Sequence, residues 1–288
     1  MLMKSNSSVI AVGESNTKNK DPKKKTPKKI FGTQEWSILN ANFINGCKHD
    51  CKYCYSKEMA IRFKRKTKDD WQNEEVRNGN LKKKFKKANG TIMFPSSHDI
   101  HPDHLNESLA FLENILVAGN KVLIVSKPHF KCIKSICDKF TKFKNNILFR
   151  FSIGSTDSNT MRFWEPNAPK FSERFASLVY AYYEGYQTSI SCEPMLDNKV
   201  EDVIKIVSPF VTDSIWIGKA NFLLKRLKIN GHEDTKTINK ARELIEWQSD
   251  ENILKLYDKI KDNQKIKWKE SIKKIVGIEV SSRKGLDI

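Results

Sequence analysis

The stretch NGCKHDCKYCY, at residues 45–55, places three cysteines on one short segment of the chain. It follows residues 37–44, whose pattern predicts a strand, and it leads into a helical pattern. Cys47, Cys51 and Cys54 are spaced four and three residues apart, so one loop can turn all three thiols toward the same inorganic centre. Three thiolates on a four-iron cube leave one iron without a protein ligand, where an external molecule can bind. The motif therefore predicts an iron-sulfur site with an open coordination position.

Zinc is the alternative metal for this loop, with His49 as the fourth ligand beside the three thiols. His49 lies only two residues from Cys47 and from Cys51, which crowds a tetrahedral shell. Structural zinc sites also usually take their second pair of ligands from a distant segment. The spacing therefore favours iron and sulfide over zinc, and His49 is interpreted as a loop residue near the cluster.

Cysteine usage also bears on the cellular compartment. The chain has six cysteines in 288 residues, and three of them lie within eight positions. That distribution favours a reducing compartment and a metal site over a disulfide framework. The sequence has no run of about 18 apolar residues and no apolar secretory leader, so we expect a cytoplasmic protein without a transmembrane helix.

Strand and helix patterns alternate six times after residue 36. The predicted strands are residues 37–44, 91–94, 122–125, 147–153, 187–193 and 214–217. Leucines recur at helical spacing between two of these strands, at positions 105, 109, 112 and 116. Short connections between alternating strands and helices predict an α/β fold with a parallel sheet. Six units predict a partial barrel rather than a closed eightfold one.

Composition divides the chain into three segments. Residues 1–32 are rich in Lys, Ser, Asn and Thr and cannot bury enough apolar surface to order themselves, so we expect a disordered basic arm. Residues 33–221 carry the barrel units. Residues 222–288 are expected to form a C-terminal helical extension that covers the open side of the barrel.

The net charge of the chain is +18, from 52 Lys and Arg against 34 Asp and Glu. Such a field attracts nucleic acid or an acidic partner. Lysine dominates the excess, with only nine arginines, and an AT-rich genome produces the same bias without selection for binding. Charge alone therefore leaves nucleic-acid binding open.

A Cys-x3-Cys-x2-Cys motif with an aromatic residue before its last cysteine, on the loop after the first of six strands, resembles the radical S-adenosylmethionine (SAM) superfamily. Residues 46–55, 94–102 and 151–169 resemble the spore photoproduct lyase-like branch, often described as DNA repair photolyase-like, and phage-associated relatives. The similarity spans residues 36–221. It implies a partial (β/α)6 barrel of the TIM type and a lyase-like radical SAM enzyme with two cofactors, a 4Fe-4S cluster and SAM.

In this superfamily SAM binds the open iron of the cluster, and one electron cleaves it to methionine and a 5'-deoxyadenosyl radical. The resemblance assigns the cluster, and with it the catalytic role, to Cys47, Cys51 and Cys54. It implies SAM and an electron donor such as a flavodoxin or a ferredoxin as partners, with nucleic acid open as the substrate and no membrane contact. The alternatives are a non-catalytic basic nucleic-acid-binding protein with a structural metal site, and an accessory protein that has lost the chemistry.

The resemblance also implies which residues contact SAM. Tyr53 occupies the aromatic position whose backbone commonly contacts adenine, and Ser96 and Ser97 end the second strand where relatives hold the SAM amino group. The glycine-rich form that is usual there is absent from this chain. The last strand ends at Gly218, where relatives let the backbone approach adenine because glycine has no side chain.

Alternation along two strands adds further candidates. Arg150 and Ser152 share one parity, and Ser191 and Glu193 share one on the next strand, so each pair lies on one face of the sheet. If that face is the barrel interior, the hydroxyls suit ribose and Arg150 suits a carboxylate. Cys192 has the opposite parity and is expected to face the helices. Photolyase-like relatives often carry arginine at position 191, and the Glu-Pro pair at 193 fits the phage-associated group, which leaves a lyase-type substrate open.

His98 and Asp99 follow the second strand at the expected mouth of the barrel. Polar side chains there have access to ligand, because active sites of such barrels lie at the carboxyl ends of the strands. A helix cap or a loop position is the simpler interpretation of either residue alone.

Overall fold

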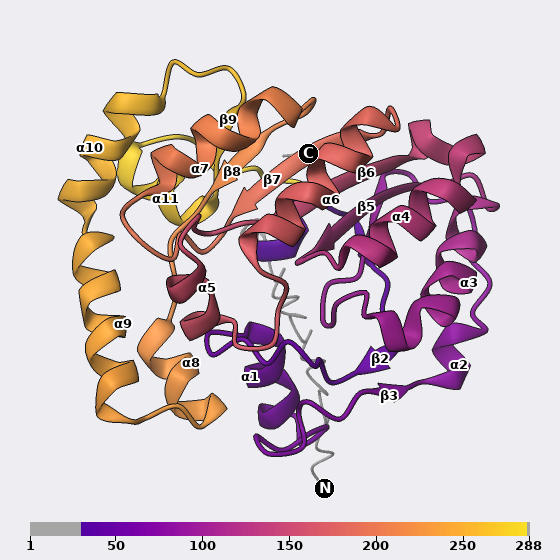
Figure 1. Cartoon of the computed structure of the whole chain (residues 1–288), viewed down its shortest axis with the longest axis horizontal. Coiled ribbons are helices and arrows are strands. Elements are labelled where there is room, and N and C mark those ends of the chain that lie inside the picture. The colour runs from indigo at the N-terminus through magenta and orange to yellow at the C-terminus, as the bar shows by residue number, and fades with distance from the viewer. Residues whose placement is uncertain (1–29, 287–288) are drawn as a thin grey trace, which may run out of the picture.

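The computed structural model describes residues 30–286 of the chain, as helices that surround a curved sheet (Figure 1). Residues 1–29 of the expected basic arm, residues 1–32, lie outside the described range. Its last residues belong to the folded part, since Ile30 is buried and a short 3-10 helix begins at Gly32. Within residues 30–286, no helix is both long enough and apolar enough to cross a membrane.

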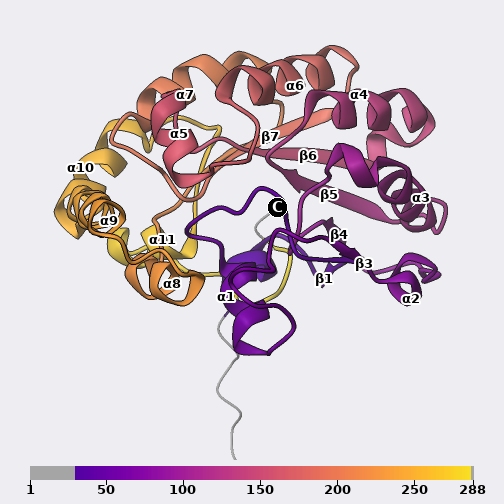
Figure 2. The ribbon, with the colours of Figure 1, turned by 60° about the horizontal axis from the view of Figure 1, so that its bottom comes forward.

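Seven parallel strands form the main sheet, in the order β1-β4-β5-β6-β7-β8-β9. Their bounds are β1 (Leu39–Asn40), β4 (Thr91–Phe94), β5 (Lys121–Ser126), β6 (Ile147–Ser152), β7 (Gln187–Cys192), β8 (Ile215–Ile217) and β9 (Ile266–Trp268). Figure 2 shows these strands as an open arc with helices along its outer side. The predicted α/β fold with a parallel, partial barrel is confirmed.

Helices follow the strands and cover the outer face of the arc. The α-helices are α1 (Tyr55–Arg62), α2 (Asn78–Leu81), α3 (Leu105–Leu116), α4 (Phe130–Lys139), α5 (Ser158–Trp164), α6 (Phe171–Tyr183), α7 (Val200–Val207), α8 (Leu223–Asn230), α9 (Thr235–Trp247), α10 (Asp250–Ile260) and α11 (Glu270–Val276). Short 3-10 helices lie at Gly32–Glu35, Pro102–His104, Thr141–Asn146 and Ser208–Phe210. Side-chain caps define several starts: Asp157 accepts a hydrogen bond from Thr160 N before α5, and Asp234 caps α9 in the same way.

Alternate residues of the strands separate two cores. Ile124, Phe149 and Ile190 point outward into the large core beneath α3, α4, α6 and α7. The inward-facing residues belong to a smaller core inside the arc, made of Trp36, Met93, Leu123, Leu148 and Trp216. Cys192 belongs to the outer core, as its parity predicts.

The first predicted strand, residues 37–44, is divided in the structure. β1 pairs with β4, but the chain then leaves the sheet, and β2 (Ile44–Asn45) pairs antiparallel with β3 (Glu75–Val76). The physical reason lies at Asn42, whose side chain accepts hydrogen bonds from two backbone N–H groups just beyond β4, at 2.8 and 3.0 Å. A side chain thus satisfies donors that a longer first strand would otherwise have to pair.

The sequence pattern predicts only helices in residues 222–288, yet β9 extends the sheet there. Lysines at positions 265, 267 and 269 flank its two apolar residues. The segment therefore looks charged and lacks the apolar run by which the other strands are predicted. Lys267 lies over the Trp216 ring at 5.5 Å, and Lys269 lies over the Trp36 ring at 3.9 Å. Trp36 and Trp216, which come from distant parts of the chain, therefore stabilise these lysines at the edge of the arc. The local sequence pattern does not contain these contacts and does not predict the strand.

Candidate functional site

The cysteine loop, residues 46–54, connects β2 to α1. Gly46 begins it with a φ of +94°, and a Cβ there would lie 2.7 Å from the carbonyl oxygen of Trp71. Cys47 N donates a hydrogen bond to the same oxygen at 3.0 Å. Cys54 ends the loop as the N-cap of α1, where its Sγ accepts a hydrogen bond from Lys57 N at 3.4 Å. A glycine and a helix start therefore define the two ends of the loop.

All three thiols are free of disulfides; Cys51 is buried, and Cys47 and Cys54 are half-buried. Burial raises the pKa of the Cys47 thiol well above its usual value, and the negative charges of Asp99 and the two other cysteines raise that pKa further. Burial also raises the pKa of Cys51 and the pKa of Cys54. Thiolates at these positions need positive charge nearby, which the iron ions of a cluster would supply. The donor set therefore fits an iron-sulfur cluster.

Contacts from both sides hold the cysteine loop. Asp50 Oδ1 lies 2.8 Å from Lys57 Nζ, and its second oxygen accepts a hydrogen bond from Gln72 at 2.9 Å. Asn230, the last residue of α8, donates hydrogen bonds to the carbonyl oxygens of Lys52 and Cys54 at 2.9 and 3.0 Å. A helix of the C-terminal extension thus contributes to the site.

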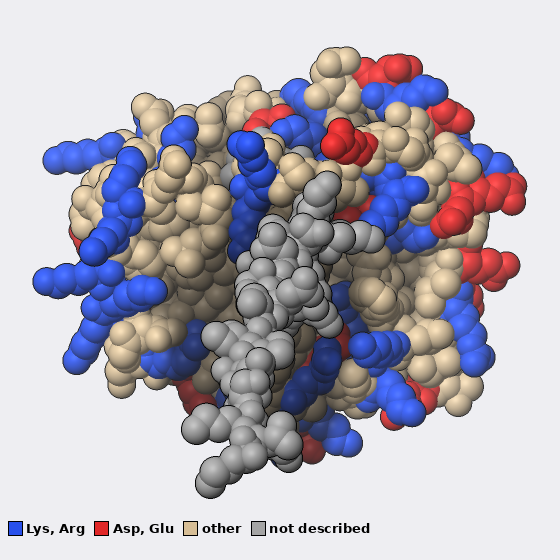
Figure 3. All heavy atoms as spheres, turned by 180° about the vertical axis from the view of Figure 1, so that it is seen from behind, with Lys and Arg blue, Asp and Glu red and all other residues tan. Residues whose placement is uncertain are grey.

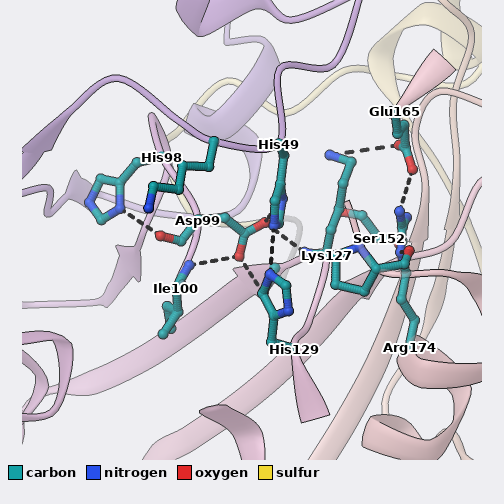
Figure 4. A network of polar contacts seen from close by, with 12 residues as sticks. His49, His98, Asp99, Ile100, Lys127, His129, Ser152, Glu165 and Arg174 are labelled. Atoms are coloured by element: carbon teal, nitrogen blue, oxygen red, sulfur yellow. Dashed lines mark hydrogen bonds and ion pairs between the residues drawn. The ribbon is translucent and has the colours of Figure 1, made fainter. Parts of the chain in front are cut away.

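Both ring nitrogens of His49 are engaged by groups other than the thiols (Figure 4). Nδ1 lies 3.3 Å from Asp99 Oδ2, and Nε2 lies 3.1 Å from Nε2 of His129. His49 therefore has no free nitrogen for the fourth position of a zinc site. Among the described residues, no three His, Cys, Asp or Glu side chains converge on a point suited to a single metal ion.

Asp99 is the centre of this contact network (Figure 4). Its carboxylate also accepts hydrogen bonds from Ile100 N and Lys127 N, each at 2.8 Å, and from Ser126 Oγ at 2.5 Å. Burial favours the neutral acid, but the charges of His49 and Lys127 and the hydrogen bonds outweigh it and lower the pKa of Asp99. An ionised Asp99 thus joins the cysteine loop to the ends of β4 and β5.

A second buried network includes Glu165, which follows α5. Its Oε2 lies 2.5 Å from Arg174 Nη2, and its Oε1 accepts a hydrogen bond from the Tyr53 hydroxyl. Lys127 Nζ lies 3.8 Å from the same Oε1. Burial disfavours the charged form of Lys127, but the negative charges of Cys51 and Glu165 outweigh it and raise the pKa of Lys127. The side chain of Lys127 is therefore a charged ammonium group beside the cysteine loop.

Ser96 and Ser97 lie where the end of β4 meets the cysteine loop. Asn42 accepts hydrogen bonds from both of their backbone N–H groups, and its amide donates to Ser96 Oγ at 2.9 Å. The hydroxyl of Tyr55, next to the last cysteine, donates to the Ser96 carbonyl oxygen. The structure thus brings this segment to the cysteine loop, and its contact with SAM stays a prediction.

The parity predicted for β6 and β7 matches the strand register. Arg150 lies opposite Ser189 and Ser152 lies opposite Ser191. Arg150 Nε donates to Ser189 Oγ at 2.9 Å, and Arg174 donates to the carbonyl oxygen of Ser152 at 2.9 Å. Ser152 and Ser191 therefore lie side by side at the carboxyl ends of their strands, where the resemblance implies the ribose.

Arg150 is fully buried inside the arc. Its Cζ lies 4.6 Å from the ring centroid of Trp36 and 5.2 Å from that of Trp216. Burial lowers the pKa of Arg150 to about 10, although the nearby Asp213 carboxylate, at 3.4 Å, opposes this effect. The carboxylate partner of Arg150 within the chain is therefore Asp213, and a contact with SAM stays a prediction.

Glu193 and Gly218 are adjacent at the ends of β7 and β8. Lys269 Nζ lies 3.4 Å from Glu193 Oε2 and 2.9 Å from the buried Glu35 Oε1. A Cβ on Gly218 would lie 2.9 Å from the Cγ atoms of both Glu193 and Lys269. The packing of these two side chains therefore requires glycine at this position, whether or not adenine approaches it.

Sequence reasoning missed Lys127, Glu165, Arg174 and Asn230 as parts of the site. Lys127 directly follows a predicted strand, and Glu165 lies in a stretch that carries the resemblance, so a local signal marks both. Arg174 lies within a helix, and Asn230 lies outside the segment of resemblance. Only tertiary contacts bring Asn230 to the cysteine loop and Arg174 to Glu165, which contacts Tyr53 of that loop.

No protein-family model matches the chain. Among known protein sequences, it is 26% identical over 183 residues to the uncharacterized protein ORF301 of Acidianus two-tailed virus, a match that covers 59% of this chain and 59% of that protein. The chain therefore spans less than two thirds of that relative. The viral source of this relative agrees with the resemblance to phage-associated proteins.

Solved structures of spore photoproduct lyase are similar to this structure. A variant with bound AdoMet and dinucleoside spore photoproduct has a TM-score of 0.53 at 14% identity, covering 74% of this chain and 66% of the lyase chain. A variant with dinucleoside spore photoproduct has a TM-score of 0.52 at 14% identity, covering 73% and 65%. The predicted relationship to spore photoproduct lyase-like radical SAM proteins is thus confirmed at the level of the fold, over slightly less than two thirds of the lyase chain.

Proposed function

We propose that this chain is a radical SAM enzyme whose 4Fe-4S cluster is held by Cys47, Cys51 and Cys54. The observation that carries the proposal is the place of the cysteine loop: three unpaired thiols lie on one loop against segments that follow β4, β5 and β6, in a fold shared with spore photoproduct lyase. With cluster and SAM bound, one-electron cleavage of SAM would supply a 5'-deoxyadenosyl radical.

The residues of this chain stabilise anionic sulfur ligands in two ways. The ammonium of Lys127 lies close enough to Cys51 for their charges to interact, and the two buried networks hold it in place. At Cys54, the first turn of α1 directs the backbone N–H of Lys57 toward Sγ. The ammonium group of Lys127 and the start of α1 therefore offset part of the rise in thiol pKa that burial causes at Cys51 and Cys54.

For SAM we propose the residues implied by the resemblance, at the carboxyl ends of the strands. Ser96, Ser97, Ser152, Ser191 and Gly218 follow or end four different strands, and Tyr53 lies on the cysteine loop. Arg150 and Glu193 are already engaged by other side chains of the chain. We therefore assign those two a positioning role around the pocket.

For the substrate we propose nucleic acid, with a lyase-like reaction. A solved structure of the lyase holds a dinucleoside photoproduct, and the net charge of this chain is +18. In Figure 3, Lys and Arg side chains project along one edge of the face shown with few acidic neighbours. A flavodoxin or ferredoxin in the cytoplasm is proposed as the electron source, in keeping with the reducing compartment inferred from the cysteines.

The test is anaerobic reconstitution with iron and sulfide, followed by reduction in the presence of SAM. We expect about four iron and four acid-labile sulfide per chain, as a 4Fe-4S cluster requires, and release of 5'-deoxyadenosine. Cys51→Ala is expected to abolish both. Cys132→Ala, which removes a thiol from the outer core, is the matched control and is expected to retain both.

A protein that binds iron but cleaves no SAM under any reductant contradicts the enzyme proposal. The competing function, a basic nucleic-acid-binding protein with a structural metal, is favoured by the +18 charge. Stoichiometric zinc without acid-labile sulfide in protein purified without oxygen would support that function instead.

A further inference from the structure

A cavity of about 570 Å³ lies between α5, the segment after β7 and α9. Lys52, within the cysteine loop, contacts its α5 wall: Lys52 N donates to the carbonyl oxygen of Trp164 at 2.9 Å, and Nζ lies 3.8 Å from the ring centroid of Phe163. Because α5 follows β6, two walls of the cavity lie at the carboxyl ends of strands, beside the proposed SAM site. The third wall, α9, belongs to residues 222–288, outside the segment of resemblance.

Two ammonium groups, those of Lys52 and Lys240, approach the aromatic ring of Phe163 at this cavity. Lys236 and Lys240 lie one turn apart on α9 and line the cavity. Lys240 Nζ lies 5.3 Å from the ring centroid of Phe163, and Lys52 approaches the same ring. Within residues 30–286, neither α9 lysine forms an ion pair, although Glu243 also lines the cavity. Their charge is therefore available to an anionic ligand.

Two of the acidic residues in the cavity walls accept hydrogen bonds from neighbouring residues of the chain. Asp157 caps α5, and Asp197 accepts a hydrogen bond from Ser155 Oγ at 2.5 Å. Asn159 and Asn198 also line the cavity, and their exposed side-chain amides make no hydrogen bond to any described residue. An amide offers both a donor and an acceptor, as the edge of a nucleobase requires.

We propose that this cavity binds one nucleotide of a single-stranded nucleic acid next to the reacting position. The base packs against Phe163 and Trp247, the amides meet its edge, and Lys236 and Lys240 hold the phosphate. Unpaired ammonium groups beside aromatic rings favour a phosphate-bearing ligand over a polypeptide backbone. The inference rests on the proposed function, because it takes the occupant to be part of the substrate.

The test measures binding of a dye-labelled single-stranded pentanucleotide to the full chain with its cluster reconstituted, by fluorescence anisotropy at several salt concentrations. Phe163→Ala is expected to weaken binding about tenfold, in the range of one lost stacking contact. Lys236→Ala and Lys240→Ala are each expected to reduce the slope of log affinity against log salt by about 0.7, the value for one lost phosphate contact on a single strand. Arg242→Ala is the matched control, an exposed cation of α9 that does not line the cavity, and it is expected to change neither quantity.

Unchanged affinity and salt slope in all three cavity variants would overturn the inference, as would tighter binding of a pentapeptide than of the pentanucleotide. Cleavage of SAM is measured on the same preparations. A wild-type protein that binds through these residues but cleaves no SAM keeps the inference and rejects the proposed function. One that cleaves SAM but binds the oligonucleotide independently of them rejects the inference alone.

Discussion

Asn230 donates a hydrogen bond to the carbonyl oxygen of Cys54 at 3.0 Å, although 176 residues separate them in the chain. The same amide group also holds the carbonyl oxygen of Lys52. The cysteine loop therefore depends on α8, a helix outside the part of the sequence that resembles radical SAM proteins.

We predict that Asn230→Ala lowers cluster retention. The change leaves two loop carbonyl groups without their partner, at a cost of about 1 to 3 kcal/mol. Iron and acid-labile sulfide per chain, measured after desalting, should fall, while far-UV circular dichroism stays that of the wild type. Asn239→Ala, at an exposed position of α9, is the control and should retain the cluster.

The pair Glu165 and Arg174 yields a prediction on stability. Both side chains are almost completely buried and lie 2.5 Å apart. Arg174→Met should destabilise the fold by about 3 to 5 kcal/mol, because it leaves a buried carboxylate without its partner. The double variant with Glu165→Gln should lose less than the sum of the two single changes, as measured by urea unfolding.

An exposed pair provides the comparison for this prediction. Lys134 and Asp138 lie 2.9 Å apart on α4, with about half of each side chain exposed. Lys134→Met should leave the urea midpoint nearly unchanged, because solvent screens that pair. Equal losses from Arg174→Met and Lys134→Met would contradict the role given to burial.

His98 leads to a prediction on pH dependence. Burial lowers the pKa of His98 to about 4, from an ordinary value of 6.5. Between these values the unfolded chain binds a proton that the folded protein excludes, so stability falls as pH falls from 6.5 toward 4. The contribution of this group is at most about 1.4 kcal/mol per pH unit.

His98→Gln removes this titrating group. We expect the variant to lose less stability than the wild type between pH 6.5 and pH 4, the window set by the two pKa values. Urea unfolding at several pH values measures the difference between the two slopes. Parallel slopes would show that His98 is protonated equally in the folded and unfolded states.

Gly218 provides a prediction on packing. A Cβ at this position would lie 2.9 Å from the Cγ atoms of Glu193 and Lys269, so Gly218→Ala should destabilise the protein by about 1 to 3 kcal/mol. Gly79→Ala is the matched control, because a Cβ there meets no atom within 4 Å. It should leave the melting temperature unchanged or raise it slightly. A melting temperature unaffected by Gly218→Ala would show that Glu193 and Lys269 can move aside.

The local sequence pattern was sufficient for most of the sheet. The strand at residues 91–94 is found as predicted, and the strands from β5 to β8 differ from their predicted bounds by one or two residues. Parallel strands that are buried on both faces consist of nearly continuous apolar residues, so the local sequence is enough to predict them. The spacing of the cysteines and the parity of Ser152 and Ser191 are likewise local properties, so the sequence alone predicts both.

Tertiary structure decided what those elements meet. The first strand is divided because Asn42 binds the end of β4, and β9 joins the sheet because Trp36 and Trp216 accept lysine side chains. Lys127 and Asn230 reach the cysteine loop from other elements of the chain, and Arg174 holds Glu165, which accepts a hydrogen bond from Tyr53 of that loop. Periodicity and spacing report the neighbours of a residue along the chain, whereas burial, ion pairs and pKa shifts depend on atoms brought close by folding. The sequence by itself therefore determined the parallel strands from β4 to β8 and the cysteine motif, and only folding decided the two edges of the sheet and which side chains surround the thiols.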